Sequence, residues 1–240
     1  MTADILVSAV LPVYNDRAAL EAAIPRSIEA LEGIAPGRFE VIVAEDGSTD
    51  GSAALVEDLQ ASDPRIRLLH SDARLGRGKA LNRAFEAARG TIVCYYDVDL
   101  ATDMEQLGEL VGAIAEGYDV ATGSRLMPES EIVRSGEREV ASRGYNLLVR
   151  TILKSRLHDH QCGFKAFNRE RLLALLPAVS ADHWFWDTEV LVRAQRKGYR
   201  IREFPVRWRQ GRGTTVKVKD VGEMGSAILR LWWQLHAQTD

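Results

Sequence analysis

Short apolar segments alternate with helical segments through the first 125 residues, and this alternation limits the fold more than any other feature of the chain. Apolar runs rich in β-branched and aromatic residues predict strands, and apolar residues that recur every three or four positions predict helices. The expected strands cover residues 5–11, 39–44, 66–70, 91–96 and 119–123, and the expected helices cover 17–31, 50–60, 78–88 and 104–115. Such alternation predicts an α/β fold with a mostly parallel sheet flanked by helices.

The second half has a less regular pattern, with a polar loop expected at residues 128–137, helices at 142–156, 186–197 and 220–236, and extended segments at 163–168 and 199–208. The last helix carries an apolar stripe formed by Met224, Ile228, Leu231, Trp232 and Leu235. A stripe of this kind usually belongs to a core, but the neighbouring Trp232 and Trp233 point about 100° apart and cannot both be buried on one face. We therefore expect an amphipathic helix that docks peripherally on a membrane surface.

Charge is distributed unevenly between the two halves. Residues 1–125 contain 21 acidic and 11 basic residues, whereas residues 126–240 contain 13 acidic and 20 basic residues. An acidic half suits a cation, and a basic half suits a phosphorylated substrate or an anionic membrane. No nucleic-acid-binding signature is present, so nucleic acid is not an expected partner. Cys94 and Cys162 form no zinc or disulfide pattern and no signal peptide is evident, so we expect a reducing, cytoplasmic location.

Two aspartates, Asp97 and Asp99, directly follow the strand expected at residues 91–96, with Val98 between them. Open α/β sheets bind their ligands at the carboxyl ends of the strands. Carboxylates placed there suit a hard divalent cation that holds a diphosphate. An acidic turn without a function is the alternative for this motif taken alone.

Three further segments lie at strand ends or helix starts. Glu45 and Asp46 end the second strand, where a carboxylate can accept a hydrogen bond from a nucleobase or a ribose, although an ordinary turn before a helix gives the same pattern. Pro12 is expected to end the first strand, and Tyr14 could flank a nucleobase. Lys79 lies in a glycine-rich helix start, where backbone N–H groups and the helix dipole suit an anion.

These four segments occur in the order and at the spacing of inverting family-2 glycosyltransferases with the GT-A fold, which the chain resembles over roughly residues 5–232. The second half is similar to the polyprenyl-phosphate sugar synthases, and within them most similar to the dolichyl-phosphate glucose synthases. The motifs that carry this similarity are Gly123-Ser124-Arg125, Arg138 with Ser142, Asp159-His160-Gln161-Cys162-Gly163-Phe164-Lys165, and Phe185-Trp186-Asp187-Thr188-Glu189.

The resemblance implies a nucleotide-sugar-binding half at residues 1–125 and an acceptor-binding half at residues 126–240, within one compact catalytic domain. Asp97 and Asp99 would hold Mg²⁺ or Mn²⁺, and Arg125 and Arg138 would complete the catalytic set. The implied donor-binding residues are Pro12, Tyr14, Glu45, Asp46, Lys79, Asp97, Val98 and Asp99. The implied acceptor-binding residues are Arg125, Arg138, Ser142, Asp159, Gln161, Asp187, Arg209, Arg212 and Lys217.

The reaction implied by the resemblance moves a hexose from a nucleotide sugar to dolichyl or another polyprenyl phosphate, and yields a β-linked lipid phosphosugar at the cytoplasmic face of a membrane. Glucose and a UDP-sugar are the expected hexose and donor. The second pKa of a phosphate monoester is about 6, so the acceptor is already an anion at neutral pH. Such a nucleophile needs no strong base, and the enzyme would act by positioning it and neutralising charge.

Some positions depart from the family pattern and define the alternatives. Glu45 stands where Asp is usual, His160 stands where Thr is usual, and Ala101 stands where mannose synthases commonly place a metal-binding Gln. The last departure argues against a GDP-mannose-dependent dolichyl-phosphate mannose synthase. Transfer to a hydroxyl acceptor would need a general base, and a strongly raised pKa at Asp187 or Glu189 would support it. A degenerate, non-enzymatic nucleotide-sugar-binding protein is the third alternative.

Overall fold

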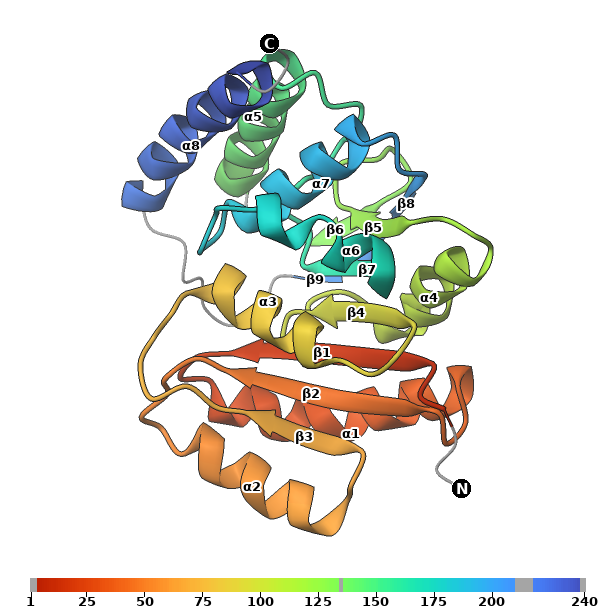
Figure 1. Cartoon of the computed structure of the whole chain (residues 1–240). Coiled ribbons are helices and arrows are strands. Elements are labelled where there is room, and N and C mark those ends of the chain that lie inside the picture. Colours follow the sequence, from red (N-terminus) through yellow and green to blue (C-terminus); the bar gives the residue numbers. More distant parts are fainter. Residues whose placement is uncertain (1–3, 134–135, 210–217, 238–240) are drawn as a thin grey trace.

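Seven strands form one sheet in the order β3-β2-β1-β4-β7-β5-β8 (Figure 1). They are β1 (Val7–Val13), β2 (Phe39–Glu45), β3 (Ile66–Leu69), β4 (Ile92–Tyr96), β5 (Val120–Ser124), β7 (Phe164–Asn168) and β8 (Ile201–Pro205). The computed structural model describes residues 4–133, 136–209 and 218–237, and gives the backbone alone for residue 138 and residues 218–224. Every strand pair of this sheet is parallel except the two made by β7, which runs antiparallel between β4 and β5. The expected α/β fold with a mostly parallel sheet is confirmed.

Helices cover both faces of the sheet. One face packs against α1 (Arg17–Ile34), α2 (Ser52–Ser62) and α4 (Leu107–Ala115), which follows the short η1 (Met104–Gln106). The other face packs against α3 (Arg77–Ala87), α6 (Arg169–Leu173) and α7 (Trp186–Arg196). Strand β1 supplies Val7, Ala9 and Leu11 to the first core and Val10 to the second. Because both faces are buried, the strands read as continuous apolar runs rather than as alternating ones.

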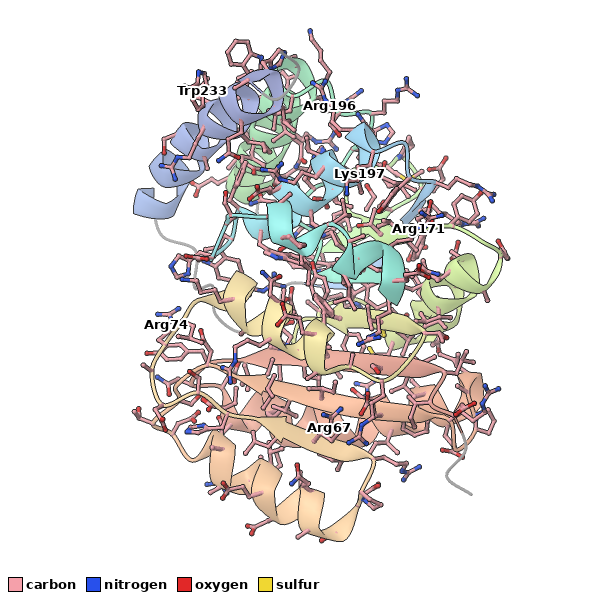
Figure 2. The ribbon with its side chains drawn as sticks, in the orientation of Figure 1. Arg67, Arg74, Arg171, Arg196, Lys197 and Trp233 are labelled. Carbon is pink, nitrogen blue, oxygen red and sulfur yellow. The ribbon has the colours of Figure 1, made fainter. Side chains whose placement is uncertain are left out.

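Two long helices, α5 (Gly136–Ile152) and α8 (Val218–Ala237), lie side by side at one end of the molecule (Figure 1). They form a third apolar cluster with α7, to which α8 contributes Ile228 and Leu231, exposed by 1% and 2%. The outer faces of the same two helices leave further apolar side chains exposed, namely Val140, Leu147, Leu148, Leu229, Trp232 and Trp233. Figure 2 shows Trp233 on the outside of α8. In the described ranges, no helix combines the length and hydropathy that a membrane span requires.

The first helix begins as predicted, because the Asp16 carboxylate accepts a hydrogen bond from the Ala19 N–H and caps α1. Pro12, however, lies within β1 and pairs with Ala44 of β2 instead of ending the strand. The ladder between β1 and β4 stops at Val10. One side of β1 is therefore unpaired at Pro12, and a residue without an N–H is tolerated there.

The loop predicted at residues 128–137 was wrong in part, because it contains the short strand β6 (Glu131–Val133) and the start of α5. Strand β6 pairs in parallel with β9 (Arg207–Arg209) and forms a separate two-stranded sheet. The short helices α6 and η2 (Leu176–Ala178) were also missed. Helices of three to five residues complete about one turn and are too short to show a periodic pattern, so no sequence signal indicated them.

Candidate active site

The carboxyl ends of three neighbouring strands bring the expected donor-binding residues to one edge of the sheet. Strands β2, β1 and β4 lie next to one another and run parallel. Tyr14 follows β1, Asp46 follows β2 and Asp97 follows β4. This edge is where open α/β sheets bind ligands. The fold therefore gathers the three residues, and their individual roles in binding stay predictions.

Asp46 organises the loop that precedes α3. Its side chain is nearly buried, and its two carboxylate oxygens accept hydrogen bonds from the N–H groups of Leu75 at 2.7 Å and Gly76 at 3.0 Å. The adjacent Gly47 has a φ of +77°, and a Cβ at this position would lie 2.7 Å from the backbone of Ala73. Only glycine fits there, because the backbone of the loop approaches so closely. Asp46 and Gly47 together fix residues 73–76 at the edge of the sheet.

Glu45 and Tyr14 differ in how far a ligand can reach them. The Glu45 carboxylate is completely buried, accepts a hydrogen bond from the Ser48 N–H and pairs with His70. The Glu45 side chain therefore lies inside the protein, and the expected part of this residue in forming the donor pocket stays a prediction. Tyr14 is 38% exposed, and the Arg74 guanidinium lies 4.0 Å from the centre of its ring. An accessible aromatic ring and a planar cation are suited to stacking with a base.

Lys79 and the start of α3 are already occupied by protein groups. The N–H of Gly78 donates to the backbone oxygen of Asp182 at 2.7 Å, and the Lys79 ammonium lies 2.9 Å from the Asp182 carboxylate. A Cβ at Gly76 would lie 2.3 Å from the His183 ring, so this loop packs directly on the helix start. The Gly78 N–H is thus not open to an anion, because the loop before α7 fills the position, and donor binding by Lys79 stays a prediction.

Asp97 and Asp99 remain accessible, as a ligand site requires. The Asp97 side chain is 44% exposed, and its Oδ1 accepts a hydrogen bond from Arg77 Nη2 at 2.6 Å. A Cβ at Gly163 would lie 2.1 Å from Asp97 Oδ2, so the carboxylate rests against the glycine backbone. Asp99 is exposed and accepts a hydrogen bond from the Ala101 N–H at 3.1 Å. Desolvation by the surrounding protein atoms and the charge of Asp97 raise the pKa of Asp99.

This donor set fits a divalent metal ion. Two neighbouring carboxylates whose charges repel each other are stabilised by a cation, and carboxylate oxygens are the ligands that Mg²⁺ and Mn²⁺ prefer. Val98, between them, is half-buried and packs against the core. Its side chain offers no metal ligand and instead anchors the turn that carries the two aspartates. No group of three or more His, Cys, Asp or Glu side chains suited to a metal occurs within the described residues. The protein side chains at this site therefore supply two carboxylates.

A row of buried charges leads away from Asp97 and was missed by the sequence reasoning. Arg77 Nη1 donates to Asp187 Oδ2 at 2.6 Å, and the Lys165 ammonium donates to Asp187 Oδ1 at 2.9 Å. The Tyr95 hydroxyl also donates to Asp187. A lysine between the apolar residues Phe164 and Ala166 of strand β7 was a signal in the sequence, but its partner could not be identified because the paired residues lie far apart in the chain.

Burial changes the titration of this row. It raises the pKa of Asp187 to about 6, against the opposing charge of Arg77. It also lowers the pKa of Lys165 to about 8. Burial disfavours the charge of Arg77 as well, but the carboxylates of Asp97 and Asp187 outweigh this and raise the Arg77 pKa. At neutral pH Lys165 and Arg77 are therefore cations, and Asp187 between them is an anion.

Arg125 forms a buried ion pair with Asp159. Arg125 Nε donates to Asp159 Oδ2 at 2.7 Å, and Arg125 Nη2 donates to Asp159 Oδ1 at 3.0 Å. The Arg125 guanidinium carbon also lies 5.8 Å from the centre of the Trp208 ring. Burial favours the neutral acid, but Arg125 holds the pKa of Asp159 well below its usual range. Asp159 is fully buried and therefore cannot bind an acceptor directly, contrary to expectation. It fixes the Arg125 guanidinium instead.

The other expected acceptor residues lie in different environments. The Ser142 hydroxyl oxygen is buried and has no hydrogen-bond partner among the described residues. Gln161 is half-buried beside Asp159, to which its N–H donates at 3.0 Å. Arg209 is exposed, and its N–H donates to Ala101 at 2.8 Å, which places β9 beside the Asp97–Ala101 turn. Outside the described side chains lie Arg138, Arg212 and Lys217.

His160, a departure from the family pattern, has a structural environment. Its ring is fully buried, with Nδ1 2.7 Å from Asn146 Oδ1 and Nε2 2.7 Å from the Ser155 hydroxyl. Burial lowers the pKa of His160 to about 3, so the ring is neutral. Asn146 belongs to α5, and His160 therefore ties the motif at residues 159–165 to that helix.

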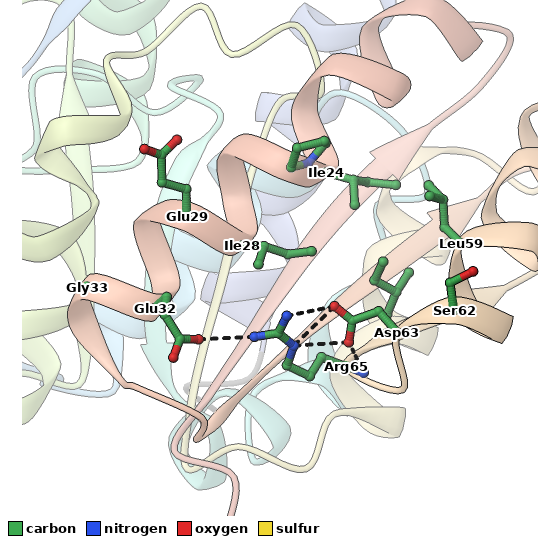
Figure 3. A pocket seen from close by; sticks show the side chains of 11 residues that line it. Ile24, Ile28, Glu29, Glu32, Gly33, Leu59, Ser62, Asp63 and Arg65 are labelled. Atoms are coloured by element: carbon green, nitrogen blue, oxygen red, sulfur yellow. Dashed lines mark hydrogen bonds and ion pairs between the residues drawn. The ribbon is translucent and has the colours of Figure 1, made fainter.

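A groove between α1 and α2 lies away from these residues (Figure 3). Its lining is mainly apolar and includes Ile24, Ile28 and Leu59. At its rim, Arg65 pairs with Glu32 and Asp63. It reaches the start of β3, which is the amino end of the parallel strands, whereas the acidic residues follow the carboxyl ends. The groove is thus separate from the candidate site.

The chain is similar in sequence to known glycosyltransferases. The chain is 55% identical over 236 residues to glycosyltransferase AglD of Haloferax volcanii. The matched region covers 97% of this chain but 38% of that protein. The chain thus spans well under half of this relative. It is 29% identical over 230 residues to dolichyl-phosphate beta-glucosyltransferase of Saccharomyces cerevisiae, covering 88% of this chain and 69% of the relative. It is also 30% identical over 203 residues to polyprenol monophosphomannose synthase of Mycolicibacterium smegmatis, covering 82% and 75%.

Solved structures share the fold. Glucosyl-3-phosphoglycerate synthase of Mycobacterium tuberculosis in complex with UDP matches with a TM-score of 0.69 at 24% identity, over 97% of this chain and 80% of that one. Mannosyltransferase PcManGT of Pyrobaculum calidifontis matches with a TM-score of 0.58 at 23% identity, over 87% and 57%. The GT-A fold is confirmed. The family model for glycosyl transferase family 2 matches residues 8–175, and together with the Asp97–Asp99 edge this shows that the chain belongs to glycosyl transferase family 2.

Proposed function

We propose that this chain transfers glucose from UDP-glucose to dolichyl or another polyprenyl phosphate, with inversion at the sugar C1. The observation that carries the proposal is the accessible pair Asp97 and Asp99 at the ligand-binding edge, with Arg77 beside the first and Arg209 beside the turn that follows. Relatives described as dolichyl-phosphate beta-glucosyltransferases support dolichyl phosphate as the acceptor and glucose as the sugar. The similarity to a polyprenol monophosphomannose synthase makes mannose the competing sugar. Ala101 favours glucose, because its methyl group offers no metal ligand.

Asp97 and Asp99 would hold a divalent cation, as their chemistry fits. Structures of glucosyl-3-phosphoglycerate synthase in complex with Mn²⁺ and UDP support this assignment for the fold. When bound, such a cation neutralises the charge that develops on the leaving nucleoside diphosphate. Tyr14 and Arg74 already stack on each other, so the nucleobase would stack on an outer face of this pair, next to the loop that Asp46 fixes.

The basic residues of the second half would bind the acceptor phosphate. Arg125 is held rigidly by Asp159, so its guanidinium is preorganised, and such groups lose little entropy when they bind an oxyanion. The Ser142 hydroxyl oxygen is buried, so its expected contact with the acceptor phosphate stays a prediction. Arg138, Arg212 and Lys217 stay predicted contributors. An oxygen of the phosphate dianion would attack the sugar C1 while the bond from C1 to the diphosphate oxygen breaks and UDP leaves, and this single displacement would invert that centre.

The raised pKa of Asp187 does not make it a general base for a hydroxyl acceptor. Its carboxylate is 3% exposed and already accepts hydrogen bonds from Arg77, Lys165 and Tyr95. A base must lie within hydrogen-bonding reach of the proton that it removes. Asp187 is enclosed by protein groups instead, and this supports an acceptor that is already ionised.

A donor and acceptor panel tests the proposal. Purified protein with Mn²⁺ or Mg²⁺ is incubated with UDP-glucose or GDP-mannose and a short-chain polyprenyl phosphate, and the lipid product is identified by mass spectrometry. Glucosyl transfer with UDP-glucose, lost when the metal is chelated, is the expected result. Transfer from GDP-mannose alone, or to a lipid alcohol but not to the phosphate, would contradict the proposal.

Membrane docking through α5 and α8 is part of the same proposal, and the cytoplasmic side stays a prediction. The exposed apolar residues on these helices could enter the interfacial region and bring the site to its lipid acceptor. Sedimentation with anionic liposomes tests this, with Leu229→Ser/Trp233→Ser as the variant. Val133→Ser is the control, because Val133 is 63% exposed on β6, outside the two helices. Equal sedimentation of the variant and the control would exclude α8 as the docking element.

A further inference from the structure

Four charged side chains of alternating sign form a row from the core to the candidate cation site. The Lys165 ammonium lies 2.9 Å from Asp187, Arg77 lies 2.6 Å from Asp187 on its other side, and Arg77 also lies 2.6 Å from Asp97. Side-chain exposure rises along this row, from 0% at Lys165 through 4% at Asp187 and 13% at Arg77 to 44% at Asp97. The buried end is therefore fixed, and Asp97 is the end that a ligand can reach.

The Arg77 guanidinium has a buried anchor besides Asp97. Asp187 anchors it with a charge-assisted hydrogen bond, and the rings of Tyr95 and Trp184 lie 5.2 Å and 5.4 Å from its carbon. Rings at this distance stabilise a cation. A positive charge fixed 2.6 Å from Asp97 Oδ1 opposes the binding of a second cation at the same carboxylate.

The rest of the described structure offers a bare cation little compensation. No cluster of three or more ligating side chains occurs there, so the protein contributes the two aspartates. A divalent ion that prefers six oxygen ligands must complete its shell with water or with oxygens of another ligand. A nucleoside diphosphate carries such oxygens, and its negative charge offsets both Arg77 and the metal ion.

The geometry points to Arg77 as a resident counter-ion of Asp97, which weakens binding of the divalent cation until a nucleoside diphosphate is bound. This inference rests on the proposed function, because it uses the assignment of Asp97 and Asp99 as metal ligands. Arg77 is then a positioning residue with two effects. It holds the Asp97 carboxylate in place without metal, and it makes metal binding and nucleotide binding cooperative.

Titration of Mn²⁺ followed by electron paramagnetic resonance measures this without turnover. The dissociation constant for Mn²⁺ is determined with and without UDP for the wild type, Arg77→Met and Arg83→Met. Arg83 is the matched control, because it lies on the same helix and donates to the backbone of His70. Without UDP, Arg77→Met is expected to bind Mn²⁺ at least about tenfold more tightly than the wild type. The tightening of Mn²⁺ binding by UDP is expected to be correspondingly smaller in this variant.

An unchanged or weaker Mn²⁺ affinity of folded Arg77→Met overturns the inference. If this variant does not fold, Arg77→Lys replaces it, since an ammonium keeps the charge beside Asp187 but cannot span both carboxylates as the guanidinium fork does. Its Mn²⁺ affinity without UDP is expected to rise at least about threefold, and no rise overturns the inference. Asp97→Asn tests the assignment of Asp97 as a metal ligand separately from the role of Arg77. If it binds Mn²⁺ with UDP as the wild type does, the metal assignment itself fails.

Discussion

Gly163→Ala should disable the enzyme without unfolding it. The added Cβ would lie 2.1 Å from Asp97 Oδ2 and 2.5 Å from Cγ, whereas ordinary contact begins at 3.4 Å. The carboxylate must therefore move by about 1.3 Å, which breaks its alignment with Arg77. A misplacement of about 1 Å in a catalytic group costs about 10²-fold in rate. We expect a loss of this size in glucosyl transfer and a weaker affinity for Mn²⁺ in the presence of UDP.

The fold should tolerate this change, because the atoms displaced are the end of a partly exposed side chain. Glucosyl transfer to a short-chain polyprenyl phosphate is measured with the melting temperature of each variant. Gly108→Ala is the matched control, because nothing lies within 4 Å of its added Cβ in α4. Its activity should equal that of the wild type. Full activity of Gly163→Ala would show that the position of Asp97 does not limit the reaction, and would refute this reasoning.

Three further predictions concern Asp99, Arg125 and His160. Asp99→Ala should abolish transfer and leave the far-ultraviolet circular dichroism unchanged, and near-normal turnover would contradict the metal assignment. Arg125→Met leaves the Asp159 carboxylate buried without its cation, so the free energy of unfolding measured in urea should fall by about 3–5 kcal/mol. Most of this stability should return in Arg125→Met/Asp159→Asn. Folding lowers the pKa of His160 from 6.5 to about 3, so the neutral ring stabilises the folded state. This stabilisation is complete above pH 6.5 and is lost as the pH falls toward 3. The free energy of unfolding, measured in urea, should fall by about 2 kcal/mol between pH 6.5 and 5 because of this group. In His160→Gln the free energy of unfolding should depend correspondingly less on pH.

The order of elements and the location of the acidic edge could be predicted from the sequence, because both depend on local patterns. Strand ends followed by Asp46 and Asp97 place these residues at one edge in a parallel sheet. The pairing of charges could not be predicted, since it depends on contacts between distant residues. Arg77 and Asp187 are 110 positions apart, and no periodicity connects them.

Burial of charged residues was the second property beyond the reach of sequence reasoning. Asp159 looked like a ligand of the acceptor, yet it is enclosed with Arg125. Glu45 looked like part of a base pocket, yet it faces the core and holds Ser48 and His70. A charged residue in a loop usually contacts solvent. These exceptions follow from partners brought together by the fold.

The central place of β7 affects how the chain can be made. Strands β4 and β5 precede it in the sequence, but they touch one another only through it. During synthesis on the ribosome, β5 has no neighbour until residues 164–168 have emerged, and β4 keeps one bare edge over the same interval. Bare strand edges pair readily with other chains. Fragments released before that point should therefore aggregate, and chaperones should be needed most while α5 is being translated.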